Sequence, residues 1–307
     1  MKSTQKHEKE GDRNNDDDDE TPPECATKDF RQTESLISKQ DAKQDAKHEE
    51  SKREITKQTD TNSVGAVLVG AKQFYIPPSK PVFIVAHPNP TSQHMLQHGI
   101  FEKELIQWVK QFLKPNEDML DIGAHCGTYS LSLAPHCRNV YAFEAQRMTY
   151  FQLCGGIALN YAENVWPRHL ALGSKKGKMT LHITSNDGGG STLNKTWTEK
   201  QRQHCLRTEI CETKTLDSFE FGFGTGESAK VKICFIKIDV EGHELEVLKG
   251  AQQTIKANQR PIILFEVWNE AWYENTKSEL FRFILETLRY RAIVQAPYAH
   301  NMFIARD

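Results

Sequence analysis

Residues 121–131 read DIGAHCGTYSL, and they follow Met119 and Leu120 at the end of a strand-like run. In α/β proteins a glycine-rich turn after an apolar run joins a strand to a helix, and nucleotide-like cofactors bind at such turns. This turn therefore indicates an α/β fold and raises the question of which cofactor it holds.

Strand-like and helical segments alternate on both sides of the turn. The strand-like segments are residues 139–145, 166–173, 177–183, 231–240 and 260–268. The helical segments are residues 101–113, 147–162, 243–258 and 276–290, the last opening with a capping box from Thr276 to Glu279. Residues 291–297 and 300–307 are typical of an antiparallel hairpin. The alternation predicts a mostly parallel sheet with helices on both faces and ligands at the carboxyl ends of its strands.

The uneven distribution of apolar residues divides the chain into three parts. Residues 1–62 carry the charged stretches NNDDDDE and QDAKQDAK and little that can be buried. Such a segment buries too little apolar surface to offset its ordering entropy, so we expect a disordered charged tail. We expect an N-terminal extension over residues 63–114, with a helix that packs on the core, and the main α/β domain over residues 115–307.

Composition argues against several classes of protein. The formal net charge is −2, which offers no broad basic surface for nucleic acid. Seven cysteines without a C-x-x-C pair favour reduced thiols. The start MKSTQKHEKE lacks the apolar core of a secretory signal, and VGAVLVGA is too short to span a bilayer. We therefore expect a cytoplasmic protein with no membrane span.

The glycine spacing argues against nucleotides that carry phosphates. The dinucleotide fingerprint G-x-G-x-x-G, counted from Gly123, fails at His125 and at Thr128. No G-K-[ST] step follows, so the turn is not a phosphate-binding Walker loop. The segment EFGFGTG at 220–226 has more glycines, but neither a buried strand before it nor a helix after it, so we read it as a connection.

S-adenosylmethionine fits the turn better, because it has a ribose and positive charges but no phosphate. Asp121 favours positive charge near Gly123 and Gly127, and Glu144 ends the next strand about twenty residues on, where a carboxylate can bind ribose hydroxyls. The alternative is an empty α/β turn in which the glycines only permit packing.

A second group of acidic residues follows the later strands. Asp239 ends one apolar run and precedes Glu241 and His243, and Glu266 ends the next run. Neighbouring strand ends would place Asp239 and Glu266 at one pocket. Asp239 or His243 could act as a general base, or Asp239 and Glu266 could hold Mg²⁺. The alternative for His243 is that it merely begins a helix.

The order of DIGAHCGTYS, YAFEAQ, IKIDVEGHELEVLKGA and RPIILFEVW resembles the FkbM-type methyltransferases, over about residues 95–305. This resemblance implies a Rossmann-like class I methyltransferase fold with a mostly parallel seven-stranded sheet and a C-terminal antiparallel hairpin. It also implies S-adenosylmethionine as the methyl donor and a hydroxyl of a sugar, lipid or small metabolite as the acceptor. His125 and Cys126 depart from the leanest form of the family's glycine motif.

The resemblance implies a role for individual residues. Those implied to line the methionine part of the cofactor are Asp121, Gly123, Ala124 and Gly127, with Glu144 on the ribose. Asn164 and the stretch 169–173, which includes Ala171, would lie near the adenine. The segment NDGGGSTLNKTW at 186–197 would flank the acceptor, so its residues Ser191 and Trp197 are candidate substrate contacts. Glu241 is a further candidate substrate contact. A plain surface hairpin is the alternative for that segment.

The leading hypothesis is an O-methyltransferase for a small-molecule, glycan or lipid acceptor. A catalytically silent module that recruits a partner through its tail is the alternative from another class. A protein or nucleic-acid methyltransferase is less well supported, because no acidic-Pro-Pro-aromatic motif for exocyclic amines is present. The oligomeric state is left open.

Overall fold

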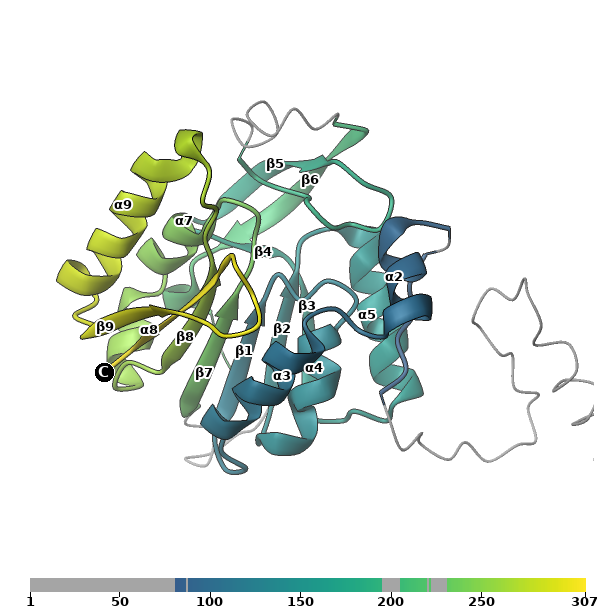
Figure 1. The fold of residues 1–307 in the computed structure, drawn as a ribbon, viewed down its shortest axis with the longest axis horizontal. Helices are drawn as coiled ribbons and strands as arrows, with labels where there is room; N and C mark the ends of the chain where they lie inside the picture. The colour runs from purple at the N-terminus through teal and green to yellow at the C-terminus, as the bar shows by residue number, and fades with distance from the viewer. Residues whose placement is uncertain (1–80, 87, 195–204, 220, 222–230) are drawn as a thin grey trace, which may run out of the picture. The chain divides into compact units, whose positions relative to one another are not determined.

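The computed structural model describes residues 81–86, 88–194, 205–219, 221 and 231–307 (Figure 1). The predicted tail over 1–62, most of the connection at 220–226 and the candidate substrate contact Trp197 lie outside these residues.

The main sheet of the described chain has seven strands in the order β3-β2-β1-β7-β8-β10-β9 (Figure 1). The strands are β1 (Asp118–Ile122), β2 (Val140–Glu144), β3 (Val165–His169), β7 (Ile233–Ile238), β8 (Ile262–Glu266), β9 (Ala292–Gln295) and β10 (Met302–Arg306). Neighbours from β3 to β8 pair in parallel, whereas β10 is antiparallel to both β8 and β9. The predicted mostly parallel sheet with its C-terminal antiparallel hairpin is confirmed.

Helices cover both faces of this sheet because its central strands are apolar on both sides. Met119 of β1 packs with buried residues of α3 (Lys103–Val109), α4 (Thr128–Leu133) and α5 (Arg147–Leu159). Its neighbour Leu120 points to the other face and packs with α7 (Glu244–Lys249), α8 (Gln252–Ala257) and α9 (Glu274–Arg282). A strand buried on both faces is typical of parallel sheets. The carboxyl ends of β1, β2, β7 and β8 therefore lie between two layers of helices.

A second, three-stranded sheet stands beside the carboxyl ends of the main strands, in the order β4-β6-β5 (Figure 1). Its strands are β4 (Ala171–Leu172), β5 (Gly177–Ile183) and β6 (Arg207–Lys214). The sequence did not predict β6, because RTEICETK is mostly polar and only Cys211 and Thr213 are buried. This segment forms a strand because it pairs with β5, although its own sequence has no apolar strand pattern.

Two helix predictions need correction. The helix predicted over 243–258 is two helices, since α7 ends at Gly250, where a Cβ atom would lie 2.0 Å from the carbonyl oxygen of Gly173. The capping box from Thr276 is wrong, because α9 begins at Glu274 directly after a 3₁₀ turn over Ala271–Tyr273.

The N-terminal part of the described chain forms α2 (Pro90–His98) and then α3, which continues as a 3₁₀ turn over Lys110–Phe112. Asn89 caps α2 by accepting a hydrogen bond from Ser92 N. None of the helices described is long and apolar enough to cross a membrane.

Candidate cofactor and catalytic site

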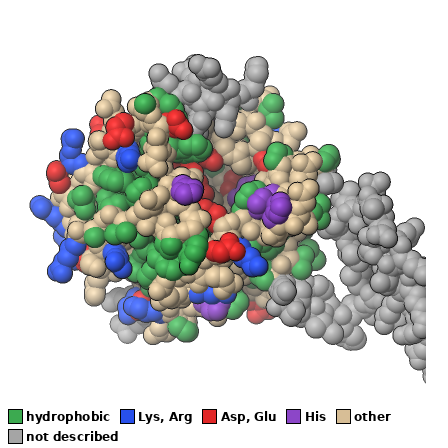
Figure 2. Space-filling view, viewed as in Figure 1, with side chains coloured by type: hydrophobic (Ala, Val, Ile, Leu, Met, Phe, Trp, Pro, Cys, Tyr) green, Lys and Arg blue, Asp and Glu red, His purple; other side chains and the backbone are tan. Residues whose placement is uncertain are grey.

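A cavity of about 380 Å³ opens at the carboxyl ends of β1, β2 and β7. The residues that line it include Gly123, Glu144, Ala171 and Asp239, which come from four separate segments. The volume is within the range of small-molecule sites, about 300–1,000 Å³. In the space-filling view, acidic side chains are visible in a hollow on this face (Figure 2).

The glycine turn forms one side of the cavity, and its two glycines have different structural roles. Gly123 has a φ of +79°, and a Cβ atom on it would lie 1.8 Å from the carbonyl oxygen of Asp239. Only glycine allows β1 and β7 to approach so closely at their ends. Gly127 does not line the cavity; at φ +91° it starts α4 and packs against Leu153. Ala124, between them, does line it.

Asp121 lies behind the turn rather than in the cavity. Its side chain is fully buried, and its Oδ2 accepts a hydrogen bond of 2.6 Å from Ser130 Oγ. Its Oδ1 lies 3.7 Å from Lys237 Nζ. Asp121 is therefore not among the residues that line the cavity, and its contacts are with Ser130 and Lys237.

Glu144 ends β2 and reaches the cavity with its carboxylate held in place. Its Oε2 accepts a hydrogen bond of 2.8 Å from His125 N, and its Oε1 accepts one of 2.8 Å from Gln146 N. Burial raises the pKa of Glu144, while these two N–H donors and the charge of His125 oppose that rise. Each carboxylate oxygen has a second lone pair, so the oriented group can still accept hydrogen bonds from a ribose.

The two residues expected near the adenine lie in different places. Ala171 lines the cavity together with Leu170 and Leu172, which gives that part an apolar surface. The structure does not bring Asn164 there, because Asn164 precedes β3 at the amino end of the sheet. Its amide donates hydrogen bonds to backbone carbonyls of the loop before β2, the shortest of 2.8 Å to Ala134 O. The expectation for Asn164 is corrected accordingly.

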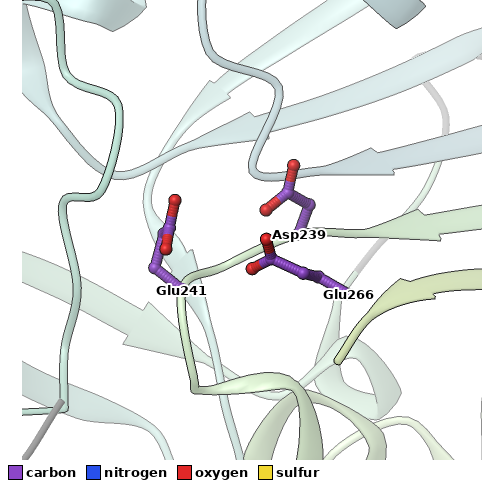
Figure 3. Close-up of side chains that lie close together, drawn as sticks. All are labelled: Asp239, Glu241 and Glu266. Carbon is purple, nitrogen blue, oxygen red and sulfur yellow. The ribbon is translucent and has the colours of Figure 1, made fainter. Parts of the chain in front are cut away.

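Three carboxylates lie close together, and two of them, Asp239 and Glu241, line the other side of the cavity. Asp239 follows β7, Glu241 lies in the next turn and Glu266 ends β8, and one oxygen of each lies within 4.8 Å of the others. Figure 3 shows the three side chains close together, with Asp239 and Glu241 on one stretch of chain and Glu266 on another. The turn itself is sharp, with φ +53° at Glu241 and +88° at Gly242.

Burial and repulsion by neighbouring carboxylates raise the pKa values of Glu241 and Glu266. Burial, then the charges of Asp239 and Glu244, raise the pKa of Glu241 to about 8. The same causes raise the pKa of Glu266 well above its ordinary value, although Asn301 donates a hydrogen bond of 2.7 Å to its Oε1. A proton or a cation must therefore neutralise part of the cluster near neutral pH.

Two further residues of this region have defined positions. Glu244 is buried and closes the turn by accepting hydrogen bonds from Val240 N (3.1 Å) and Gly242 N (3.2 Å). His243 lines the cavity and packs against Gly173. Burial lowers the pKa of His243, so its ring is neutral at neutral pH, the form that accepts a proton.

Ser191 also lines the cavity, on the segment between β5 and β6. Within the described ranges its hydroxyl oxygen is buried and has no hydrogen-bond partner. A buried hydroxyl without a partner costs free energy, so a bound molecule that reaches it would gain a hydrogen bond.

Sequence reasoning missed Lys237, the buried centre of the site. Its Nζ donates a hydrogen bond of 2.7 Å to Gly123 O and lies 3.3 Å from Asp239 Oδ2. Burial alone would lower the pKa of Lys237, but the charges of Asp239, Asp121 and Glu102 raise it above its ordinary value. The signal was a lysine inside the otherwise apolar run ICFIKIDV, since a buried lysine is almost always paired.

Tyr129 and Glu102 were missed too, and both line the cavity. The hydroxyl of Tyr129 donates a hydrogen bond of 2.7 Å to Glu102 Oε2, and the Lys237 ammonium lies 5.4 Å from the centre of its ring. The sequence gives no signal for this contact. The pattern of the helix that follows Glu102 identifies apolar packing positions but no partner for Glu102.

A seven-stranded sheet in this strand order, with a cavity at the carboxyl ends of its first strands, defines the Rossmann-like class I methyltransferase fold. Residues 121–292, more than half of the chain, match the family model described as the methyltransferase FkbM domain. The chain therefore belongs to the FkbM methyltransferase family.

Two curated relatives share part of the chain. The hexuronic acid methyltransferase AglP of Haloferax volcanii is 27% identical over 157 residues, which are 51% of this chain and 59% of that protein. The methyltransferase sdnD of Sordaria araneosa is 29% identical over 179 residues, 51% of this chain and 68% of that protein. The chain thus spans less than two thirds of the first relative's length.

Solved structures of methyltransferases are also similar. The precorrin-6y C5,15-methyltransferase of Geobacter metallireducens has 13% identity and a TM-score of 0.41, covering 75% of this chain and 97% of that chain. TYW2 of M. jannaschii in complex with AdoMet has 18% identity and a TM-score of 0.32, covering 66% of this chain and 71% of that chain.

Proposed function

We propose that this protein is a methyltransferase that uses S-adenosylmethionine to methylate a hydroxyl group of a sugar, lipid or small metabolite. One observation carries the proposal. A single cavity has the glycine turn and the Glu144 carboxylate on one side and the carboxylates of Asp239 and Glu241 on the other. The first side suits a cofactor with a ribose and no phosphate, and the second suits an acceptor that must lose a proton.

In this proposal each part of the cofactor meets a different part of the cavity. Gly123 and Ala124 lie along the methionine part, where backbone can approach closely. Glu144 accepts hydrogen bonds from the ribose hydroxyls, and Ala171 lies against the adenine. Asp121 and Gly127 act indirectly, through the shape of the turn and the packing of α4.

The proposed reaction is an in-line displacement. A bond forms between the acceptor oxygen and the methyl carbon while the bond from that carbon to the sulfonium sulfur breaks, and the hydroxyl proton leaves to a base. Asp239 is the proposed base, because it lines the cavity and is only half-buried. His243 is the alternative, since its ring is neutral near pH 7.

The carboxylate cluster also fits a divalent cation. Oxygen donors are the ligands that Mg²⁺ prefers, and Asp239, Glu241 and Glu266 would hold it. A bound Mg²⁺ would lower the pKa of an acceptor hydroxyl that coordinates it. Without the ion, Asp239 and Glu241, which line the cavity, would orient the acceptor.

The acceptor class is supported by a relative. The Haloferax volcanii protein is named for a hexuronic acid, so we propose sugars as the first acceptors to test.

Calorimetric titration of the full chain with S-adenosylmethionine, with NAD as control, tests the cofactor part. Micromolar binding of the first and none of the second is expected. The acceptor part is tested by the formation of S-adenosylhomocysteine with uronic acids, neutral sugars and lipid alcohols. Cofactor binding without turnover on any hydroxyl acceptor would refute the acceptor class and favour a protein that only binds.

A further inference from the structure

His125 adopts a backbone conformation that suits glycine better than histidine. Its φ is +52°, in the left-handed region, and it stands in the turn between Gly123 and Gly127. A residue other than glycine held there costs on the order of 1 kcal/mol or more, and persists when the surroundings determine it. The side chain of His125 therefore has contacts that a glycine would lack.

The ring of His125, which lines the cavity, contacts a distant segment of the chain. Its Nε2 donates a hydrogen bond of 2.7 Å to the carbonyl oxygen of Asp187, a residue 62 positions further along the chain. Burial lowers the pKa of His125, but Cys126, the Glu144 charge and this carbonyl raise it to about 9. The ring is thus protonated at neutral pH, and hydrogen bonds from a charged donor are stronger than neutral ones.

Residues 187–191, the glycine segment, form a wall of the cavity. Gly188, Gly189, Gly190 and Ser191 all line it. The wall approaches α5 so closely that a Cβ atom on Gly188 would lie 2.1 Å from Thr149 Oγ1. The three glycines have no side chains that could pack against neighbouring elements. A few polar contacts therefore fix the position of this wall.

Those contacts join the glycine segment to the surrounding elements. The Asp187 carboxylate is buried and accepts hydrogen bonds at Oδ2 from Thr91 N (3.3 Å) and Thr91 Oγ1 (2.7 Å) of α2. Just after the segment, Thr192 Oγ1 donates a hydrogen bond of 2.5 Å to the carbonyl oxygen of Glu241 in the carboxylate cluster. The segment thus links the glycine turn, α2 and the cluster.

We propose that His125 is a positioning residue: its ring fixes the glycine segment as the acceptor-side wall and couples occupation of the glycine turn to the position of that wall. The backbone N–H of His125 holds Glu144 and its ring holds Asp187, so one residue contacts both sides. The inference rests on the proposed function, since it takes the turn as the cofactor site.

The test is hydrogen exchange of residues 184–194 in the full chain, alone and with S-adenosylhomocysteine as probe. His125→Gly keeps the backbone N–H to Glu144 and relieves the positive φ, so the protein should still fold. Protection of residues 184–194 in the free protein should fall about tenfold, the worth of one charge-assisted hydrogen bond. The further protection given by the probe should also be lost.

Two more variants sharpen the test. His125→Gln keeps an N–H donor and should restore part of the protection. Thr91→Val removes a hydroxyl contact on the other side of Asp187 and should leave the response to the probe in place. Unchanged protection of free His125→Gly would overturn the inference. Failure of the probe to bind the wild type would instead refute the proposed cofactor site, and the free-protein comparison still decides the role of the ring contact.

Discussion

The Lys237 ammonium lies between the two halves of the site, 2.7 Å from Gly123 O in the cofactor turn and 3.3 Å from Asp239 Oδ2 beside the carboxylate cluster. Both charged groups stand on β7 or just after it, two residues apart. Because side chains alternate along a strand, residues two apart share a face, and the buried cation can hold its neighbour's carboxylate in place.

Lys237→Met should strongly destabilise the fold. It leaves Asp121, which is fully buried, without its cation, and breaking a buried pair in this way costs about 3–5 kcal/mol. Urea denaturation followed by circular dichroism measures the loss. Lys249→Met is the matched control, because its pair with Glu246 is exposed and should contribute about 0–1 kcal/mol. Equal losses in the two variants would contradict the role of Lys237.

Glu144→Ala should weaken binding of S-adenosylmethionine by about 1–3 kcal/mol, the worth of one or two hydrogen bonds to a carboxylate. Calorimetric titration measures it. Glu163→Ala, at an exposed position, is the control for a lost negative charge. Unchanged affinity of Glu144→Ala would move the ribose site elsewhere.

Asp239→Asn should leave cofactor binding in place and lower turnover by a factor of about 10²–10⁴, as expected for loss of a general base. The readout is S-adenosylhomocysteine formed with the best acceptor, together with cofactor affinity by calorimetry. A variant that turns over normally would remove Asp239 from the mechanism, and loss in His243→Ala instead would assign the base to His243.

Raised pKa values in the carboxylate cluster make stability fall with increasing pH. The folded protein holds a proton on Glu241 up to about pH 8, whereas the unfolded chain releases it near its ordinary value of 4.5. Stability from this group is therefore fully present below that lower value and is lost as the pH rises through about 8. Urea denaturation at several pH values should show the decline, and Glu241→Gln should flatten it. A wild-type profile without this decline would contradict the raised pKa.

Added Mg²⁺ should reverse that loss if the cluster binds a cation. The melting temperature at about pH 8 should rise with Mg²⁺ in the wild type, because a ligand that binds only the folded state stabilises it. Glu266→Gln removes one of the three ligands and should abolish the rise. An equal rise in melting temperature in both proteins would assign the effect to Mg²⁺ bound elsewhere. No rise in either protein would mean that protons, not a cation, neutralise the carboxylate cluster.

Contacts between distant segments are the ones that sequence reasoning missed or misplaced. Lys237 could have been suspected from its apolar strand, but its partners are set by how β1 and β7 pair. The contact between His125 and Asp187 depends on the path of the segment after β5. The family resemblance implied a place for Asn164 near the adenine, yet Asn164 lies at the amino end of β3.

The sequence by itself determined the features that follow from local patterns along the chain, namely the strands, the helices and the residues at the strand ends. Apolar runs alternating with helical patterns determined the sheet. Gly123 at the end of β1 and Glu144 at the end of β2 could be placed at one cavity, because the carboxyl ends of parallel strands lie at the same edge. Only the tertiary structure decided which side chains meet across that edge. The position of Lys237 between Asp121 and Asp239, and the burial that raises the pKa of Glu241, arise from the packing of segments that are far apart in the sequence.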